Sequence, residues 1–203
     1  MANNPLLLLL LGAAGLYFGK LWLDDARAAR AGRANPRALP GATFASGRAI
    51  AYACAGAIAI LIAETLGEHH LGLSDEQSTI TGLFALYTLT AAIIEEIIFR
   101  GYLVIDGRGP ALRWVGIVGA SALFALLHPF LWQWDDAGFA LTLTRKGAFS
   151  TAIVFATSLW LYYARFAAWN PTHSLLPCIA AHAAKNAGVI AIKAATGFVH
   201  GLW

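Results

Sequence analysis

The stretch "TITGLFALYTLTAAIIEEIIFRGYLV", residues 79 to 104, has the length of a membrane span but carries three ionisable side chains in its second half. About 20 consecutive apolar residues cross a bilayer core, so the stretch predicts a transmembrane helix. Its charged residues are Glu95, Glu96 and Arg100. An ionised group near the bilayer centre costs about 2.5–3.5 kcal/mol on insertion scales. These three residues are therefore candidates for a functional site.

The composition of the whole chain is that of an integral membrane protein. Of its 203 residues, 59% are hydrophobic and 12% are charged, and the mean hydropathy is +0.63. Backbone in lipid must satisfy its own hydrogen bonds, which favours helices. We expect an all-α polytopic membrane protein of about six transmembrane helices, at about residues 5–23, 48–66, 79–104, 114–132, 148–168 and 175–199.

The basic residues predict how the spans are oriented. The loop 24–48 holds five arginines, whereas the loop 68–78 has no lysine or arginine. By the positive-inside rule the first, third and fifth loops face the cytoplasm and both termini face outward. The fourth loop fits less well, because Arg145 and Lys146 lie on the outer side, where we expect Asp135 and Asp136 to offset them.

No internal repeat or linker divides the chain, which predicts a single membrane domain over residues 1–203. Within it, residues 1–78 form two N-terminal helices with a basic loop, and residues 79–200 form the core that holds the charged span. The formal net charge is only +3, and no nucleic-acid motif is present. The expected partner is the lipid bilayer, and not nucleic acid.

The two glutamates differ in their expected surroundings. Glu96 and Arg100 are four residues apart on a helix, so they can form an ion pair. Glu95 points about 140° away from Arg100 and lacks that partner. A buried carboxylate without a cation is a candidate general base. Alternatively, Glu95 forms a hydrogen bond to a neighbouring helix.

Two later pairs, each four residues apart, add polar groups to other spans. Phe124 and His128 lie in the fourth span, and His182 and Asn186 lie in the sixth. Each pair alone is more typical of helix packing than of catalysis. At 1.5 Å per residue from one membrane face, Glu95 lies at about 16 Å, His128 at about 21 Å, His182 at about 10 Å and Asn186 at about 16 Å. Their similar depth predicts one shared site inside the membrane.

Lys185 is an unexpected cation beside this third pair. It lies about 60° from His182 around the helix, given 100° per residue. If it faces the site, it can bind a substrate carboxylate. The alternative is an ion pair with an acidic residue of another helix, such as Glu64.

Taken together, the three motifs resemble the CAAX-protease and bacteriocin-processing (CPBP, or Abi) family of intramembrane endopeptidases. The family pattern is EExxxR, FxxxH and then HxxxN or HxxxD on successive helices. It is matched by "EEIIFRG" at 95–101, "FALLH" at 124–128 and "HSLLPCIAAHAAKN" at 173–186, over about residues 80 to 190. The resemblance implies a four-helix catalytic core. It also implies that Glu95 and His128 activate water and that His182 and Asn186 stabilise the oxyanion, with Glu96, Arg100 and Phe124 as support.

The predicted function is therefore an intramembrane glutamic endopeptidase of a prokaryotic inner membrane. Its expected substrate is a membrane-associated or lipidated protein, cut near its C-terminal tail or anchor during processing or protein sorting. The sequence lacks HExxH, so we favour chemistry without a metal or other cofactor over a zinc mechanism. Two alternatives are a proton-coupled carrier, in which Glu95, His128 and His182 relay protons, and a non-catalytic scaffold or immunity factor.

Overall fold

The computed structural model describes residues 4–33, 35–135 and 138–203. Long helices make up most of it: α1 (Pro5–Arg30), α2 (Gly47–His70), α3 (Gly82–Glu96), α4 (Pro110–Leu127), α5 (Arg145–Phe166) and α6 (Leu176–Ala195). A short 3₁₀ turn, η1 (Ser74–Glu76), precedes α3, and a π-helical segment, η2 (Ile97–Tyr102), continues it. The remaining elements are two strands, β1 (Trp132–Asp135) and β2 (Gly138–Leu141).

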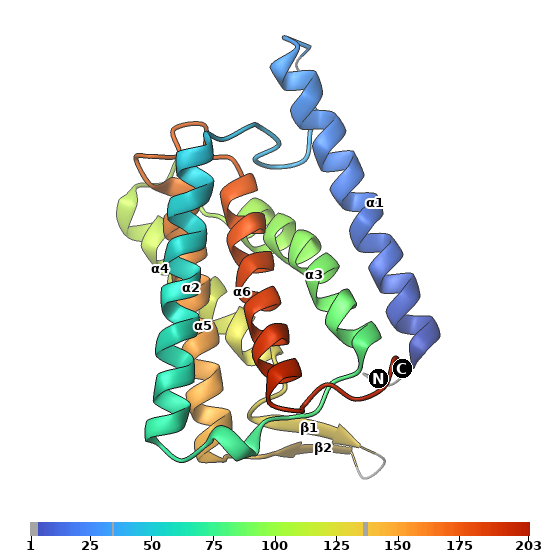
Figure 1. Cartoon of the computed structure of the whole chain (residues 1–203). Helices are drawn as coiled ribbons and strands as arrows, with labels where there is room; N and C mark the ends of the chain where they lie inside the picture. Colours follow the sequence, from blue (N-terminus) through green and yellow to red (C-terminus); the bar gives the residue numbers. More distant parts are fainter. Residues whose placement is uncertain (1–3, 34, 136–137) are drawn as a thin grey trace.

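The predicted all-α polytopic membrane fold is confirmed. Five elements are long and apolar enough to cross a bilayer: α1, α2, α3 with η2, α4 and α5. The sixth predicted span, α6, is not among them. It packs against α2, α3 and α5, so protein covers much of its surface and its polar side chains need not face lipid (Figure 1). The protein is thus an integral membrane protein in which α6 packs against α2, α3 and α5.

The fourth span ends earlier than the predicted boundary at residue 132. Helix α4 stops at Leu127, and His128 has extended backbone geometry, with ψ of 127°. The cause is Pro129, because proline disfavours helical geometry in the residue before it. The chain then forms the antiparallel hairpin β1–β2, in which Trp132 pairs with Leu141. The sequence predicted a loop, and not a hairpin, after the fourth span.

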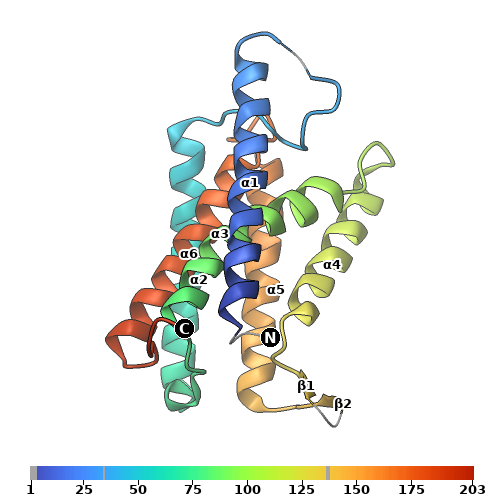
Figure 2. The ribbon, with the colours of Figure 1, turned by 90° about the vertical axis from the view of Figure 1, so that its right-hand side faces the viewer.

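The loops separate into two groups at opposite ends of the bundle (Figures 1 and 2). One group comprises the connections 31–46, 103–109 and 167–175, and we call this the basic end. Here the Leu175 N–H donates to the Gly41 carbonyl over 3.0 Å. The hairpin, η1 and the C-terminal tail lie at the other end, as the distribution of arginines predicted. There Lys146 forms an ion pair with Glu68; Asp136 and the side chain of Asp135 lie outside the described residues.

Small side chains let the helices that carry the site approach closely. Buried residues of α2, α5 and α6 form one cluster: Ala53, Ala57, Leu161, Ala164, Cys178 and Ala181. Helix α1 lies against α3 at Gly15, where an added Cβ would come within 2.7 Å of the Thr90 carbonyl oxygen. Interfaces of small residues are typical of membrane helices. The packing holds α6 between α2 and α3 (Figure 1).

Candidate active site

The predicted ion pair between Glu96 and Arg100 is confirmed, and it is completely buried. Arg100 Nη1 lies 3.2 Å from Glu96 Oε1, and neither side chain has any exposed surface. The guanidinium also lies 4.5 Å from the centroid of the Phe124 ring. Its Nη2 donates to Ser158 Oγ over 2.7 Å, and Ser158 in turn donates to Ser121. A buried charge is tolerated only with such compensation.

Glu96 has a second partner that the sequence analysis did not anticipate. Its Oε1 lies 2.8 Å from Nδ1 of His182 on α6. A carboxylate accepts hydrogen bonds, so we assign a hydrogen to His182 Nδ1. Glu96 therefore orients the imidazole of His182, while Arg100 holds Glu96 in place. The arrangement fixes the direction in which the other ring nitrogen points.

Glu95 faces that other nitrogen. Its Oε2 lies 3.7 Å from His182 Nε2, which is too long for a direct hydrogen bond but short enough for one water to bridge. A third of the Glu95 side chain is exposed, whereas its neighbour Glu96 is sealed. The sequence predicted a buried Glu95 carboxylate, whereas the structure leaves part of it exposed. It is instead the accessible carboxylate of the pair.

The Phe124 ring joins the second motif to the third. Its centroid lies 4.8 Å from that of His128 and 6.1 Å from that of His182. The predicted packing of Phe124 against His128 is confirmed. His128 Nδ1 lies 2.8 Å from the Phe124 carbonyl oxygen. Because a carbonyl only accepts, Nδ1 carries a hydrogen and Nε2 of the neutral ring is the free acceptor.

Asn186 does not lie at the depth of Glu95, although the sequence predicted the same depth for both. Its side-chain amide donates to the Thr88 carbonyl over 3.0 Å, and Thr88 is two helical turns before Glu95. His182, and not Asn186, is level with Glu95. The estimate assumed straight helices starting from a common plane, whereas α3 passes into a π-helix at this depth. One amide hydrogen of Asn186 remains available for another acceptor.

The π-helical segment η2 begins directly after Glu96. The Leu103 N–H donates to the Ile98 carbonyl, five residues earlier, over 2.9 Å. Helix α5 binds the carbonyls around this turn. The single hydrogen of the Tyr162 hydroxyl is shared between the carbonyls of Phe99 and Leu103, and Arg165 donates to that of Arg100. Short π-helical segments cost hydrogen-bond quality and often occur at functional sites.

Helix α5 therefore supplies supporting residues that the sequence analysis missed. Ser158, Tyr162 and Arg165 are buried and all bind Arg100 or its segment. Their spacing places them on one helix face. The polar stripe at positions 158, 162 and 165 of this span was the signal available in the sequence.

Lys185 forms an ion pair with Glu64, one of the two alternatives predicted for it. The Lys185 Nζ lies 2.6 Å from Glu64 Oε2, with 8% and 18% of the two side chains exposed. Lys146 of α5 likewise pairs with Glu68, one turn further along α2. Two acidic residues of α2 are thus bound by cations of α5 and α6. Lys185 is thereby held against α2.

Replacing Lys185 with methionine is expected to destabilise the protein by about 1.5–3 kcal/mol, the usual contribution of a hydrogen bond to a charged group. The reason is that Glu64 would remain mostly buried without its cation. Unfolding by SDS in mixed micelles would measure the change. The double variant Glu64→Leu/Lys185→Met should recover most of the loss, because apolar pairs replace such ion pairs well. If the double variant is less stable than the single one, Lys185 and Glu64 do not act as a pair.

Among the described residues, no three His, Cys, Asp or Glu side chains are grouped as ligands of one metal ion. Glu95, Glu96 and His182 do lie together, but Nδ1 of His182 is already occupied by the hydrogen bond to Glu96. The preference for chemistry without a metal stays a prediction.

The geometry can be compared with known proteins. The profile of a family described as Type II CAAX prenyl endopeptidase Rce1-like matches residues 77–188. This region contains α3, η2, α4, α5 and the part of α6 with His182 and Asn186. No characterised protein and no solved structure matched the chain. The family match covers more than half of the chain and all three motifs, and the protein belongs to the Rce1-like family of CAAX-type intramembrane proteases.

Proposed function

We propose that the protein is a glutamate-type intramembrane endopeptidase that cuts a membrane-associated or lipidated protein near its C-terminus. Glu95 and His128 activate the attacking water, and His182 and Asn186 stabilise the oxyanion. The observation that supports this most is the meeting of three helices. His182 of α6 lies 3.7 Å from Glu95 of α3, and the Phe124 ring of α4 contacts the imidazoles of both His128 and His182.

In this proposal Glu95 is the general base. The water oxygen attacks the scissile carbonyl carbon while one water proton passes to the Glu95 carboxylate. His128 orients the same water through Nε2, the nitrogen left free by the hydrogen bond to Phe124. Glu95 then gives the proton to the leaving nitrogen as the carbon–nitrogen bond breaks. Proton transfer of this kind contributes about 10²–10⁴-fold to the rate.

The oxyanion receives hydrogen bonds from α6. Asn186 has one amide hydrogen beyond the one given to Thr88. His182 already donates from Nδ1 to Glu96, so it can donate from Nε2 only as an imidazolium, with Glu96 as its counter-charge once Glu95 holds the water proton. Donors fixed in a site with little water stabilise a developing negative charge by several kcal/mol. Arg100 and Glu96 act by positioning His182.

The family and the place of the site support this substrate class. A CAAX-type enzyme acts near the end of a chain whose neighbouring residues are held at the membrane, and Glu95 lies on a helix that is long and apolar enough to span it. We propose C-terminal processing or protein sorting in a prokaryotic inner membrane as the setting. We also propose that residues 1–203 work as one domain, because α2 supplies Glu64 and Glu68 to the catalytic core.

The test compares the C-terminal peptides of cells that express the parent chain with those of cells that express Glu95→Gln. Mass spectrometry should find one or more proteins with shortened C-termini only in the first. Both forms must be present in the membrane in equal amounts. If no C-terminal peptide differs under that condition, the proposal is wrong.

A further inference from the structure

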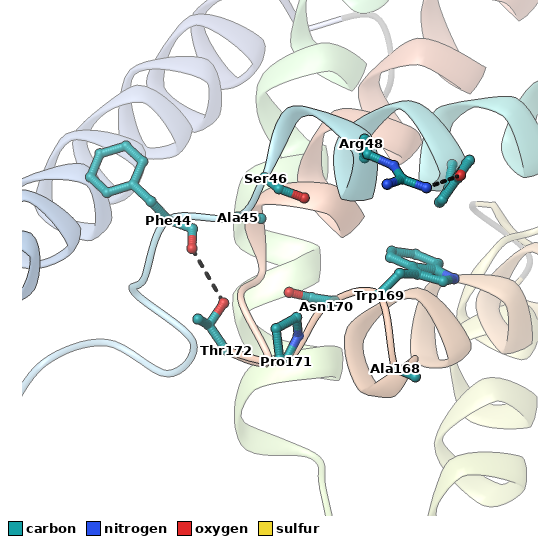
Figure 3. A pocket seen from close by; sticks show the side chains of 10 residues that line it. Phe44, Ala45, Ser46, Arg48, Ala168, Trp169, Asn170, Pro171 and Thr172 are labelled. Atoms are coloured by element: carbon teal, nitrogen blue, oxygen red, sulfur yellow. Dashed lines mark hydrogen bonds between the residues drawn. The ribbon is translucent and has the colours of Figure 1, made fainter.

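A cavity of about 400 Å³ lies at the basic end, outside the candidate active site (Figure 3). It is formed between the loop that leads into α2 and the loop that joins α5 to α6. Its lining includes a cation, three aromatic rings and the first turn of α2: Arg48, Phe44, Tyr52, Trp169 and Ser46. None of the three sequence motifs contributes to it. Its function is therefore separate from the proposed peptide cleavage.

Hydrogen bonds between the two loops give the cavity fixed walls. The Thr172 hydroxyl donates to the Phe44 carbonyl over 3.2 Å, as Figure 3 shows. Asn170 is buried, and its amide nitrogen lies within 3.0 Å of the carbonyl oxygens of Ala164, Arg165 and Ser174, which share its two hydrogens. These contacts hold the backbone on both sides. The cavity is thus preformed, as small-molecule sites usually are.

The polar groups at the cavity suit an anion. Arg48 is exposed, and its Nη2 donates to the Tyr52 hydroxyl over 3.0 Å, which holds the guanidinium beside the opening. Among the described residues no carboxylate forms an ion pair with Arg48, so most of its N–H groups can bind a ligand. Ser46 caps the Ala49 N–H, and the N–H groups of Gly47 and Arg48 lie at the positively polarised start of α2.

The aromatic side chains place the cavity at a membrane–water boundary. The Tyr52 ring lies 6.0 Å from that of Trp169, which lies 6.1 Å from that of Tyr163. Tyrosine and tryptophan concentrate at the level of the lipid headgroups. The arginine-rich loop 24–48 leads into the same end. Basic pockets between helices at such a boundary attract anionic headgroups.

From the cation, the rings and the fixed walls, we propose that this cavity binds the phosphate of an anionic phospholipid. Arg48 and the start of α2 contact the phosphate oxygens. Tyr52 and Trp169 contact the glycerol and the upper acyl chain. Arginine suits this role because its planar fork matches phosphate geometry.

Native mass spectrometry of the purified full chain in detergent tests the proposal, with phosphatidylglycerol, phosphatidylcholine or inorganic phosphate added separately. One phosphatidylglycerol should bind about tenfold more tightly to the parent chain than to Arg48→Gln, as expected for the loss of a charge-assisted contact. Phosphatidylcholine should bind the parent chain more weakly. Displacement of the lipid by millimolar inorganic phosphate would show that a free anion is the ligand, which overturns the lipid assignment.

Two further variants separate a defined site from general charge attraction. Arg33→Gln removes an equal charge from an exposed position at the same end and should leave lipid binding within about twofold. Ala45→Phe fills the cavity while keeping Arg48 and should reduce binding as strongly as Arg48→Gln. Circular dichroism and gel filtration check the fold of each variant. Equal losses with Arg33→Gln and Arg48→Gln, or no loss with a folded Ala45→Phe, would overturn the proposal.

Discussion

Replacing Glu95 with glutamine is expected to lower the cleavage rate by about 10²–10⁴-fold, the usual contribution of a general base. Glutamine has nearly the same shape as glutamate, but its amide cannot take a proton from water. Glu95 is also the accessible member of its pair, with a third of its side chain exposed and no ion pair to Arg100. Its replacement should therefore affect the chemistry and leave the fold intact.

The rate is best measured on the purified protein in lipid vesicles. A quenched fluorescent peptide with a farnesylated cysteine followed by three residues is a suitable probe for a CAAX-type enzyme. Glu76→Gln is the matched control, because it makes the same chemical change at an exposed residue of η1. A Glu95→Gln protein as active as this control would mean that Glu95 is not the base.

Replacing Arg100 with methionine is expected to destabilise the protein by about 3–5 kcal/mol, the usual cost of breaking a buried ion pair. Glu96 would keep its charge without the guanidinium and would have no exposed surface through which to reach water. The bond to Ser158 and the contact with the Phe124 ring would be lost as well. Unfolding by SDS in mixed micelles measures the loss.

Arg113→Met is a matched control for this experiment. Arg113 also pairs with a carboxylate, that of Asp106, but both side chains are exposed at the surface. The hydrogen bond from Arg113 lowers the pKa of Asp106, yet water can replace it, so the variant should unfold much like the parent. The double variant Glu96→Gln/Arg100→Met should recover part of the stability lost with Arg100→Met. If Arg100→Met and Arg113→Met have equal effects, the buried pair does not hold the site together.

Local spacing predicted several contacts that the structure contains. The pairs Glu96–Arg100 and Phe124–His128 are each four residues apart on a helix, and this spacing alone brings side chains together. The apolar runs likewise indicated the helices and the end at which each loop lies. These contacts and spans depend only on the spacing of residues along a helix and on the length needed to cross a bilayer, and both can be read from the sequence.

Contacts between helices were harder to predict. The hydrogen bond from His182 to Glu96 depends on how α6 is aligned along α3, and a one-turn difference would replace His182 with Asn186. The change from α to π geometry after Glu96 has no simple signature in residue spacing. It depends on Tyr162 and Arg165 of α5, which bind the carbonyls of that segment. Periodicity within one helix can single out a polar face, such as positions 158, 162 and 165 of α5, but it does not identify what that face contacts on another helix.

The most direct test of the proposed site is a double-mutant cycle between Glu95 and His128. The rates of Glu95→Gln, His128→Ala and the double variant are compared with that of the parent chain on the same peptide. If Glu95 and His128 act on one water molecule, removing either residue already prevents its activation. The double variant should then be no more than about threefold slower than the slower single variant. Rate losses that multiply in the double variant would show that the two residues work independently, and the shared site would be contradicted.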